Sequence, residues 1–244
     1  MSTRFYTIDL NLVKSAFLLK NPNMAAISGQ SEGKFKMPTH LQPEFFRRLD
    51  DSEDELFYIA PRFVVHIDDA AIKTVGEIYL SRLPRGGALL DLMSSWRSHL
   101  PTQLRPARVV GLGLNREEME DNPALSEIIT HNLNRTARMP FDDSSFDGAV
   151  LTVSVQYLIQ PLEVFAEVGR VLKPGAPFIV TFSNRMFPTK AVAIWANASE
   201  HQRVDLVGYY FTHSAAFEKI EMIDRSSGET DPLWAVLGYR KELE

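Results

Sequence analysis

Side chains that can bind a charged ligand or move a proton gather in a few short stretches of this chain. The run FYIAPRFVVHIDD holds Tyr58, Arg62 and His66 close together. Asn184 and Arg185 follow an apolar run much later in the sequence. A guanidinium binds a carboxylate or phosphate through two parallel hydrogen bonds, and histidine exchanges a proton near neutral pH. These stretches are therefore the candidates for holding and activating a substrate.

Proton transfer is the chemistry for which the sequence offers candidates, and His66 and Tyr157 are the candidate catalytic bases. Motifs for other chemistries are absent from the sequence. It contains no HExxH motif and no phosphate-cradling loop. Because there is no cysteine, thiolate nucleophiles and thiolate metal sites are also excluded. We therefore expect no metal centre.

The stretch 57–69 has two interpretations. Clusters of aromatic residues usually belong to a core, and the segment is then a packed helical cap whose histidine is satisfied internally. In the functional interpretation, Tyr58, Arg62 and His66 face a cofactor or substrate. The sequence leaves both interpretations open.

The clearest structural pattern lies at 140–185 and predicts a strand, a helix and a second strand. Phe146 to Val153 is a short apolar run that leaves a polar turn, as a buried strand does. Pro161 opens a segment with apolar residues at helical spacing, and the sequence KPG ends it. Phe178 to Phe182 is the second strand. Two buried strands joined by one amphipathic helix form a right-handed crossover, so the predicted sheet is parallel.

This stretch resembles the class I S-adenosylmethionine-dependent methyltransferases of the methyltransferase type 11 kind. The resemblance is carried by MPFDDSSFDGAV, by EVFAEVGRVLKPGAPFIVTF and by their spacing. It implies an α/β fold with a Rossmann-like, doubly wound sheet of seven strands, the last one antiparallel. We expect residues 1–85 to form an N-terminal extension and helical cap. Residues 86–244 are then the Rossmann-like methyltransferase domain.

Other segments complete the expected fold. Helices are predicted over Pro43–Leu56, from Asp68 or Asp69 to Leu83, and within 188–215. Residues 5–19 are read as a strand or a short helix, and 21–43 as a long surface segment. The remaining strands are expected at 88–92, 108–112, 128–131, 217–223 and 233–241.

The resemblance implies a binding site for the methionine half of the cofactor after the strand 88–92. In the family an acidic residue, here Asp91, is followed by a glycine-rich turn. The turn in this chain is MSSWRSHLP and contains no glycine. Ser94 and Ser95 are small enough to admit the ligand, and their hydroxyls can bind it or cap a following helix. Together, DLMSSWRSH and the upstream PRFVVHID resemble an uncharacterised branch of the family, with Trp96 covering the pocket.

Two further regions are implied to hold the ribose and the adenine. Gly113 stands where the family has an acidic residue for the ribose hydroxyls, which leaves Asn115 as the nearest polar group. Asn115 is equally a helix N-cap, and the two roles can coexist. At the adenine position, Asn132 replaces the family's aspartate and can accept the same hydrogen bond.

The full set of expected site residues therefore lies at the ends of five expected strands and in the N-terminal cap. Those expected to bind the cofactor are Asp91, Met93, Ser94, Ser95, Gly113, Leu114, Asn115, Asn132, Leu133, Val153 and Ser154. Those expected to bind the substrate are Tyr58, Arg62, Trp96, Asn184 and Arg185. For Asn184 the alternative is that it only turns the chain.

Composition narrows the class of partner. The net charge is −5, so no overall positive field draws the chain to nucleic acid or to an anionic membrane. No apolar run approaches the roughly 20 residues of a membrane-spanning helix, and no signal peptide is recognised. The lack of cysteine fits a reducing, cytoplasmic location. The oligomeric state is not predicted.

The function implied by the resemblance is methyl transfer from S-adenosylmethionine to a small-molecule acceptor. Two alternatives remain. The altered cofactor residues favour a methyltransferase fold that has become a non-catalytic binding or regulatory module. The fold can also support an enzyme with chemistry other than methylation.

Overall fold

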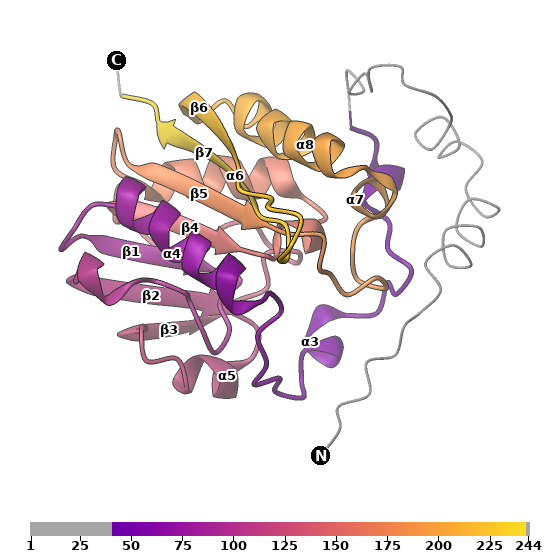
Figure 1. The fold of residues 1–244 in the computed structure, drawn as a ribbon, viewed down its shortest axis with the longest axis horizontal. Helices are drawn as coiled ribbons and strands as arrows, with labels where there is room; N and C mark the ends of the chain where they lie inside the picture. The colour runs from indigo at the N-terminus through magenta and orange to yellow at the C-terminus, as the bar shows by residue number, and fades with distance from the viewer. Residues whose placement is uncertain (1–40, 243–244) are drawn as a thin grey trace.

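The computed structural model describes residues 41–242, and the expectations for residues 5–19 and for 21–40 lie outside this range. The described chain forms a seven-stranded sheet with helices on both faces (Figure 1). In chain order the strands are β1 (Ala88–Leu92), β2 (Arg108–Gly113), β3 (Glu127–Thr130), β4 (Gly148–Thr152), β5 (Pro177–Phe182), β6 (Phe217–Asp224) and β7 (Trp234–Arg240).

The strand order is β3-β2-β1-β4-β5-β7-β6. Strands β1 to β5 are parallel, with Asp91 opposite Gly111 on β2 and opposite Val150 on β4. Strand β7 is antiparallel to both β5 and β6. The predicted doubly wound sheet with an antiparallel last strand is therefore confirmed.

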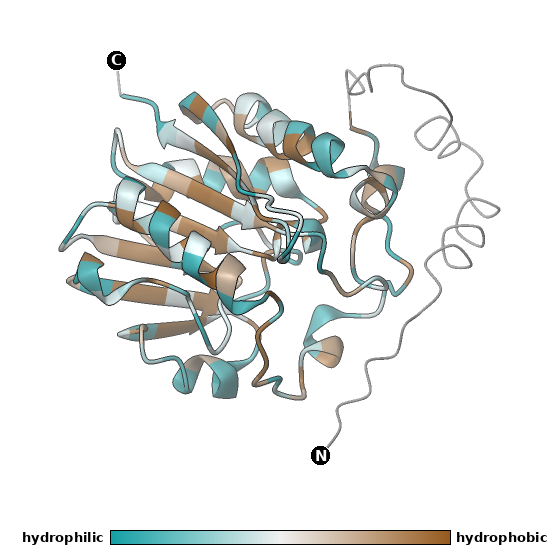
Figure 2. Ribbon diagram, viewed as in Figure 1, coloured by the Kyte–Doolittle hydropathy of each residue, from teal (hydrophilic) through white to brown (hydrophobic). Residues whose placement is uncertain are grey.

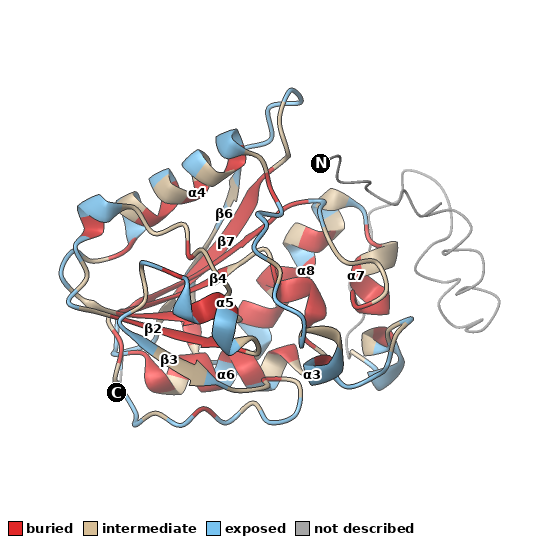
Figure 3. Cartoon of the chain, turned by 90° about the horizontal axis from the view of Figure 1, so that it is seen from below, coloured by how far each residue is buried: buried red, intermediate tan, exposed pale blue. Residues whose placement is uncertain are grey.

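One face of the sheet is covered by α4 (Asp69–Arg82), which crosses the central strands (Figures 1 and 3). The carboxylate of Asp68 caps this helix by accepting from the amide of Ala71 at 2.8 Å, as predicted. Val75 and Tyr79 of α4 pack against sheet residues such as Val150 in one buried cluster. The boundary predicted at residue 85 remains untested, but this packing places α4 with the sheet.

The opposite face is covered by α6 (Pro161–Val171) and α8 (Glu200–His213). Phe165 of α6 meets Phe178 of β5 edge to face, with ring centroids 5.0 Å apart. Figure 2 shows that the strands between the helix layers are the most apolar part of the fold. Buried strands of this kind are expected where a parallel sheet is covered on both faces.

Three shorter elements lie between the strands. Helix α5 (Arg116–Glu120) joins β2 to β3, and the 3-10 turn η4 (Val155–Tyr157) follows β4. The crossover from β1 to β2 contains only the 3-10 turn η3 (Thr102–Leu104). The helix that Ser94 or Ser95 was expected to cap is thus not formed. Instead, their hydroxyls bind carboxylates.

The segment before α4 is less helical than predicted. In place of one helix over Pro43–Leu56, the chain forms the 3-10 turn η2 (Pro43–Phe46) and the single-turn helix α3 (Asp54–Phe57). Residues between them run as irregular chain over α7 (Ala193–Asn197), where the amide of Ala193 donates to the carbonyl of Arg47 at 2.8 Å. Tertiary hydrogen bonds have here replaced helical ones. None of the helices in the described range is long and apolar enough to cross a membrane.

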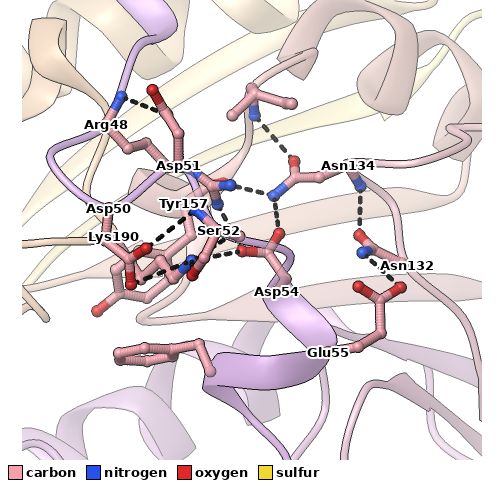
Figure 4. A network of polar contacts seen from close by, with 12 residues as sticks. Arg48, Asp50, Asp51, Ser52, Asp54, Glu55, Asn132, Asn134, Tyr157 and Lys190 are labelled. Atoms are coloured by element: carbon pink, nitrogen blue, oxygen red, sulfur yellow. Dashed lines mark hydrogen bonds and ion pairs between the residues drawn. The ribbon is translucent and has the colours of Figure 1, made fainter.

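A buried polar network fastens α3 to the sheet (Figure 4). Asp54 is 4% exposed, and its Oδ1 accepts from Arg48 Nη1 at 2.6 Å and lies 3.6 Å from Lys190 Nζ. The Lys190 side chain is 0% exposed and also donates to the carbonyl of Ser52 at 2.6 Å. Asn134 donates to the second oxygen of Asp54 at 2.8 Å. Asp54 therefore links two buried cations to the loop after β3.

Replacing Asp54 by Asn should destabilise the protein strongly. The change removes the buried anion that pairs with Arg48 and that, together with the partly exposed Asp50, pairs with Lys190. Breaking such a buried group typically costs about 3–5 kcal/mol. Urea denaturation would measure the difference in the free energy of unfolding. Arg116→Ala is the matched control, because Arg116 forms an ion pair with Glu120 at 3.0 Å in which both side chains are more than half exposed. A control loss as large as that of Asp54→Asn would contradict the central role of the network.

Candidate functional site

The candidate site lies at the carboxyl edge of the sheet, by which we mean the C-terminal ends of the parallel strands β1 to β5. The strand order reverses between β1 and β4, and ligands of such sheets bind outside this switch point. Met93 after β1 has a φ of 52°, and Val153 after β4 has a φ of 50°. A positive φ is rare for residues other than glycine and is strained for a β-branched one. Such strain tends to occur at functional sites.

Asp91 organises the turn after β1. Its carboxylate is buried, and its Oδ2 accepts from the hydroxyls of Ser94 and Ser98, each at 2.6 Å. Burial raises the pKa of Asp91 to about 6, against the opposing effect of the two hydroxyl donors. Two serine side chains thus hold a turn that glycines shape in the family. Ser98 was not among the predicted residues, although its place in SSWRS could have suggested it.

Glu118 links three segments at the same edge and was not predicted as a site residue. It is buried, and its Oε2 accepts from Ser95 Oγ at 2.6 Å while its Oε1 accepts from the amide of Arg62 at 2.7 Å. The only signal in the sequence was its position three residues after the N-cap Asn115. Glu118 joins the turn after β1 and the start of α5 to the N-terminal segment.

Asn115 has both a capping role and a second role that was not foreseen. Its Oδ1 accepts from the amide of Glu118 at 3.0 Å, which confirms the predicted N-cap. Its Nδ2 donates to the carbonyl of Tyr58 at 2.9 Å. Gly113 stands two residues before Asn115, and a Cβ there would collide with the carbonyl oxygen of Ser94. The turn after β1 therefore packs directly on the end of β2.

The expected adenine position is also engaged. Asn132 Nδ2 donates to Glu55 Oε1 at 2.9 Å, and Asn132 Oδ1 accepts from the amide of Asn134 at 2.9 Å. The hydrogen bond from Asn132 Nδ2 lowers the pKa of the Glu55 carboxyl. Leu133 is buried, and its carbonyl accepts from Gln160 Nε2 at 2.6 Å. The loop after β3 is therefore bound to α3.

Residues 58–68, which connect α3 to α4, are called the strap (Figure 1). The strap has no regular structure, so the helical-cap interpretation, one of the two left open for 57–69, does not hold for most of that stretch. The strap is bonded to Asn115 and Glu118 as described above. In addition, the carbonyl of Val64 accepts from Trp96 Nε1 at 2.9 Å. The rings of Phe63 and Trp96 also meet edge to face, with centroids 6.0 Å apart. The strap thus contacts the segments after β1 and β2 through side chains predicted to hold the cofactor or the substrate.

His66 is the strap residue predicted as a base. Its ring meets the ring of Phe187 edge to face, with centroids 5.1 Å apart. Partial removal from water lowers its pKa, with Arg62 acting in the same direction and Glu118 opposing. The lowered pKa favours the neutral form of His66, which can accept a proton.

Tyr157, the other predicted base, is buried, and its hydroxyl accepts from the amide of Phe187 at 2.8 Å. Burial raises its pKa to about 12. Its ring stacks on that of Phe187 at 5.9 Å between centroids. Tyr157 thereby fixes Phe187, a ring that the sequence analysis did not single out.

The rim after β4 and β5 differs from the prediction in one respect. Arg185 binds Asp231 Oδ1 through Nη2 at 2.7 Å, and Asp231 also receives the amide of Asp68 at 3.0 Å. Arg185 is thus engaged in holding the loop before β7 beside the strap. Asn184 is exposed, and Ser154 is buried with its hydroxyl donating to the carbonyl of Thr152 at 3.1 Å.

The side chains predicted to bind the cofactor therefore lie along one edge, but their polar groups are bonded within the protein. Asp91 binds Ser94, and Ser95 binds Glu118. Asn115 and Asn132 bind the N-terminal segment. Asn115 and Glu118 hold the strap across the positions expected for the ribose and the turn after β1.

Comparison with known proteins supports the fold and finds a family model that matches part of the chain. The model of the methyltransferase domain family matches residues 95–180, from the turn after β1 into β5. A 24-methylenesterol C-methyltransferase of Arabidopsis thaliana is 35% identical over 82 residues, covering 30% of this chain and 22% of that protein. The curated relatives are matched over only 11% to 24% of their own lengths.

Solved structures share the architecture at low sequence identity. One is a chain of the complex between the Haloferax volcanii Trm112 methyltransferase activator and a methyltransferase, with a TM-score of 0.53 and 14% identity, covering 72% of this chain and 92% of that one. Another is the [4+2]-cyclase SpnF, with a TM-score of 0.52 and 16% identity, covering 70% of this chain and 82% of that one. The resemblance to class I S-adenosylmethionine-dependent methyltransferases is confirmed for the fold and by the match to the domain model.

The buried carboxyl of Asp91 should make stability fall as pH rises. Its pKa of about 6 in the folded protein lies above the ordinary 3.8, so the folded state binds the proton more tightly than the unfolded state. The stabilisation is present below pH 4 and is lost as the pH rises to about 6. Between pH 4.5 and 7.5 this amounts to about 2 kcal/mol.

The measurement is urea denaturation of the wild type and of Asp91→Asn at both pH values. Other carboxyl groups contribute equally to both proteins, so the difference between their pH dependences isolates Asp91. The variant should gain about 2 kcal/mol relative to the wild type on going from pH 4.5 to 7.5. Parallel pH dependences would show that Asp91 titrates normally.

Proposed function

We propose that this protein is an S-adenosylmethionine-dependent methyltransferase that acts on a small-molecule acceptor. The observation that carries the proposal is the match of the methyltransferase domain model to residues 95–180 on a sheet of order 3-2-1-4-5-7-6. The matched range contains most of the residues proposed to bind the cofactor. Asp91 in β1, and Met93 and Ser94 just after it, lie before the matched range.

The cofactor would lie along the carboxyl edge from β1 to β3. Met93, Ser94 and Ser95 would border its methionine end, with Val153 and Ser154 across the switch point. Gly113, Leu114 and Asn115 would border the ribose, and Asn132 with Leu133 the adenine. Because Asn115 and Glu118 hold the strap in this structure, we propose that the cofactor enters as the strap leaves them.

The cofactor supplies an activated methyl group when bound, so the protein has little chemistry to add. Its residues must hold the acceptor in line with the methyl group and exclude water. An acceptor that loses a proton also needs a base, and His66 is proposed for this role because its lowered pKa favours the neutral form and it lies beside the rim. Tyr157 would instead position Phe187, since its hydroxyl receives the Phe187 amide.

We propose a small acceptor because the aromatic side chains of the strap lie close to the site. Tyr58, Arg62 and Trp96 would border the acceptor on the strap side, and Asn184 on the side of β5. Arg185 would lie farther from the acceptor, because its guanidinium forms an ion pair with Asp231.

One observation favours a second candidate, a methyltransferase fold that binds a ligand without catalysis. Every polar side chain at the expected methionine, ribose and adenine positions already has a partner within the described chain. If these bonds are permanent, the cofactor does not bind. The [4+2]-cyclase SpnF has a similar fold, so this fold also occurs in a protein with other chemistry.

Isothermal titration calorimetry with S-adenosylmethionine and S-adenosylhomocysteine tests the proposal. Both should bind the wild type at micromolar concentration. Leu114→Trp should weaken both by about tenfold or more, since a larger ring after β2 would fill the ribose side of the pocket.

Leu114→Ala is the matched control and should keep the wild-type affinity within about threefold. Circular dichroism of both variants would verify that they fold. No binding of either compound to the folded wild type at millimolar concentration would overturn the proposal in favour of the second candidate. Equal affinities of the two variants would overturn the placement of Leu114.

A further inference from the structure

Three aromatic rings surround the guanidinium of Arg62, and we call them the cage. They are Phe57 at the end of α3, Tyr58 at the start of the strap, and Phe187 after β5. The Arg62 Cζ atom lies 4.7 Å from the centroid of Phe57, 5.7 Å from that of Tyr58 and 5.6 Å from that of Phe187. All three distances are within the range at which a ring face attracts a cation.

The cage holds this positive charge without a carboxylate. Arg62 Nη2 donates to the carbonyl of Phe57 at 2.7 Å, and Nη1 lies 3.5 Å from that of Ala60. Within residues 41–242 Arg62 forms no ion pair, whereas Arg48 and Arg170 each bind one or more carboxylates. The rings and two backbone carbonyls are therefore what stabilise the cation at this place.

Two of the three cage walls, Phe57 and Phe187, are held in place independently of Arg62. Phe187 is fixed by Tyr157, which stacks on its ring and accepts from its amide. Phe57 belongs to α3, which the Asp54 network fastens, and the buried Nζ of Lys190 lies 5.3 Å from its ring centroid. Arg62 itself belongs to the irregular strap, whose neighbours Phe63, Val64 and Val65 are exposed by 43%, 51% and 45%. The occupant is thus on a segment without regular structure, whereas two of the walls are held by separate contacts.

Two buried polar atoms at the same rim have no hydrogen-bond partner in the described structure. They are Oε1 of Gln156 and Oγ of Ser183, on residues that are each 1% exposed. Gln156 Nε2 lies 3.4 Å from the carbonyl of Arg185, two residues before the cage ring Phe187. A buried acceptor without a partner is costly, and a ligand with an N–H or O–H group is one way to satisfy it.

We propose that the cage binds the ammonium group of the acceptor substrate and that Arg62 occupies it when no substrate is present. The role as acceptor site rests on the proposed methyltransferase function, whereas the binding of an organic ammonium does not. When the strap moves, Arg62 leaves the rings, and a cation of similar size replaces it. The cage thereby makes the substrate class an organic amine or quaternary ammonium compound.

Choline is a suitable probe, and 3,3-dimethylbutan-1-ol is its uncharged counterpart of the same shape. Titration calorimetry should show that choline binds the wild type and that the alcohol does not. Arg62→Ala should strengthen choline binding by about tenfold, because the internal competitor is removed. Adding Phe187→Leu to Arg62→Ala should weaken it again by about tenfold, since one face of the cage is lost.

Matched controls separate these effects from general changes. Arg85→Ala removes an exposed arginine elsewhere, and Phe141→Leu removes a ring that pairs with Phe146 before β4. Neither should change choline affinity. Equal choline affinities for the wild type, Arg62→Ala and the double variant would overturn the proposal, as would equal binding of the alcohol.

S-adenosylmethionine and S-adenosylhomocysteine are titrated into the same proteins to keep the two proposals distinguishable. If these compounds bind and choline does not, the cage proposal fails and the proposed function stands. If choline binds as expected and neither compound does, the cage is an ammonium site on a protein without the proposed activity. Competition between choline and S-adenosylmethionine for one site would overturn the assignment of the cage to the acceptor.

Discussion

Polar groups left at the carboxyl edge of a covered parallel sheet must find hydrogen-bond partners, and here the strap provides many of them. The amide of Arg62 binds Glu118, and the carbonyls of Tyr58 and Val64 accept from Asn115 and Trp96. These bonds fix the turn after β1 and the start of α5 in one arrangement. The position of the strap in turn sets the cage and the position of His66. The candidate site is therefore built by the contact between a chain without regular structure and the ends of regular strands.

Local patterns in the sequence were sufficient for the sheet and its principal helices. The strand Ala88–Leu92, the start of the helix at Pro161 and the N-cap at Asn115 were all predicted from neighbouring residues. The resemblance to a known family supplied the strand count and the antiparallel last strand. These features depend on interactions close in sequence or on a whole-fold pattern.

The features that were missed depend on contacts between distant residues. The helix predicted over Pro43–Leu56 gave way because Asp54 binds Arg48 and Lys190 in a buried network. Asn115 was correctly expected to cap α5, but its bond to Tyr58 joins residues too far apart for any local signal. Glu118 and Phe187 acquire their roles through residues distant in sequence, Glu118 through Ser95 and Arg62 and Phe187 through Tyr157. Arg185 was expected to bind a substrate, yet it pairs with Asp231, a partner that no spacing rule could indicate.

The central claim is that the cofactor binds the carboxyl edge by releasing the strap from Asn115 and Glu118. Hydrogen exchange of the Arg62 amide, followed by mass spectrometry with and without saturating S-adenosylmethionine, tests this directly. The account predicts faster exchange at this amide when the cofactor is bound, because Glu118 no longer accepts from it. Binding of S-adenosylmethionine with unchanged or slower exchange at Arg62 would contradict the account.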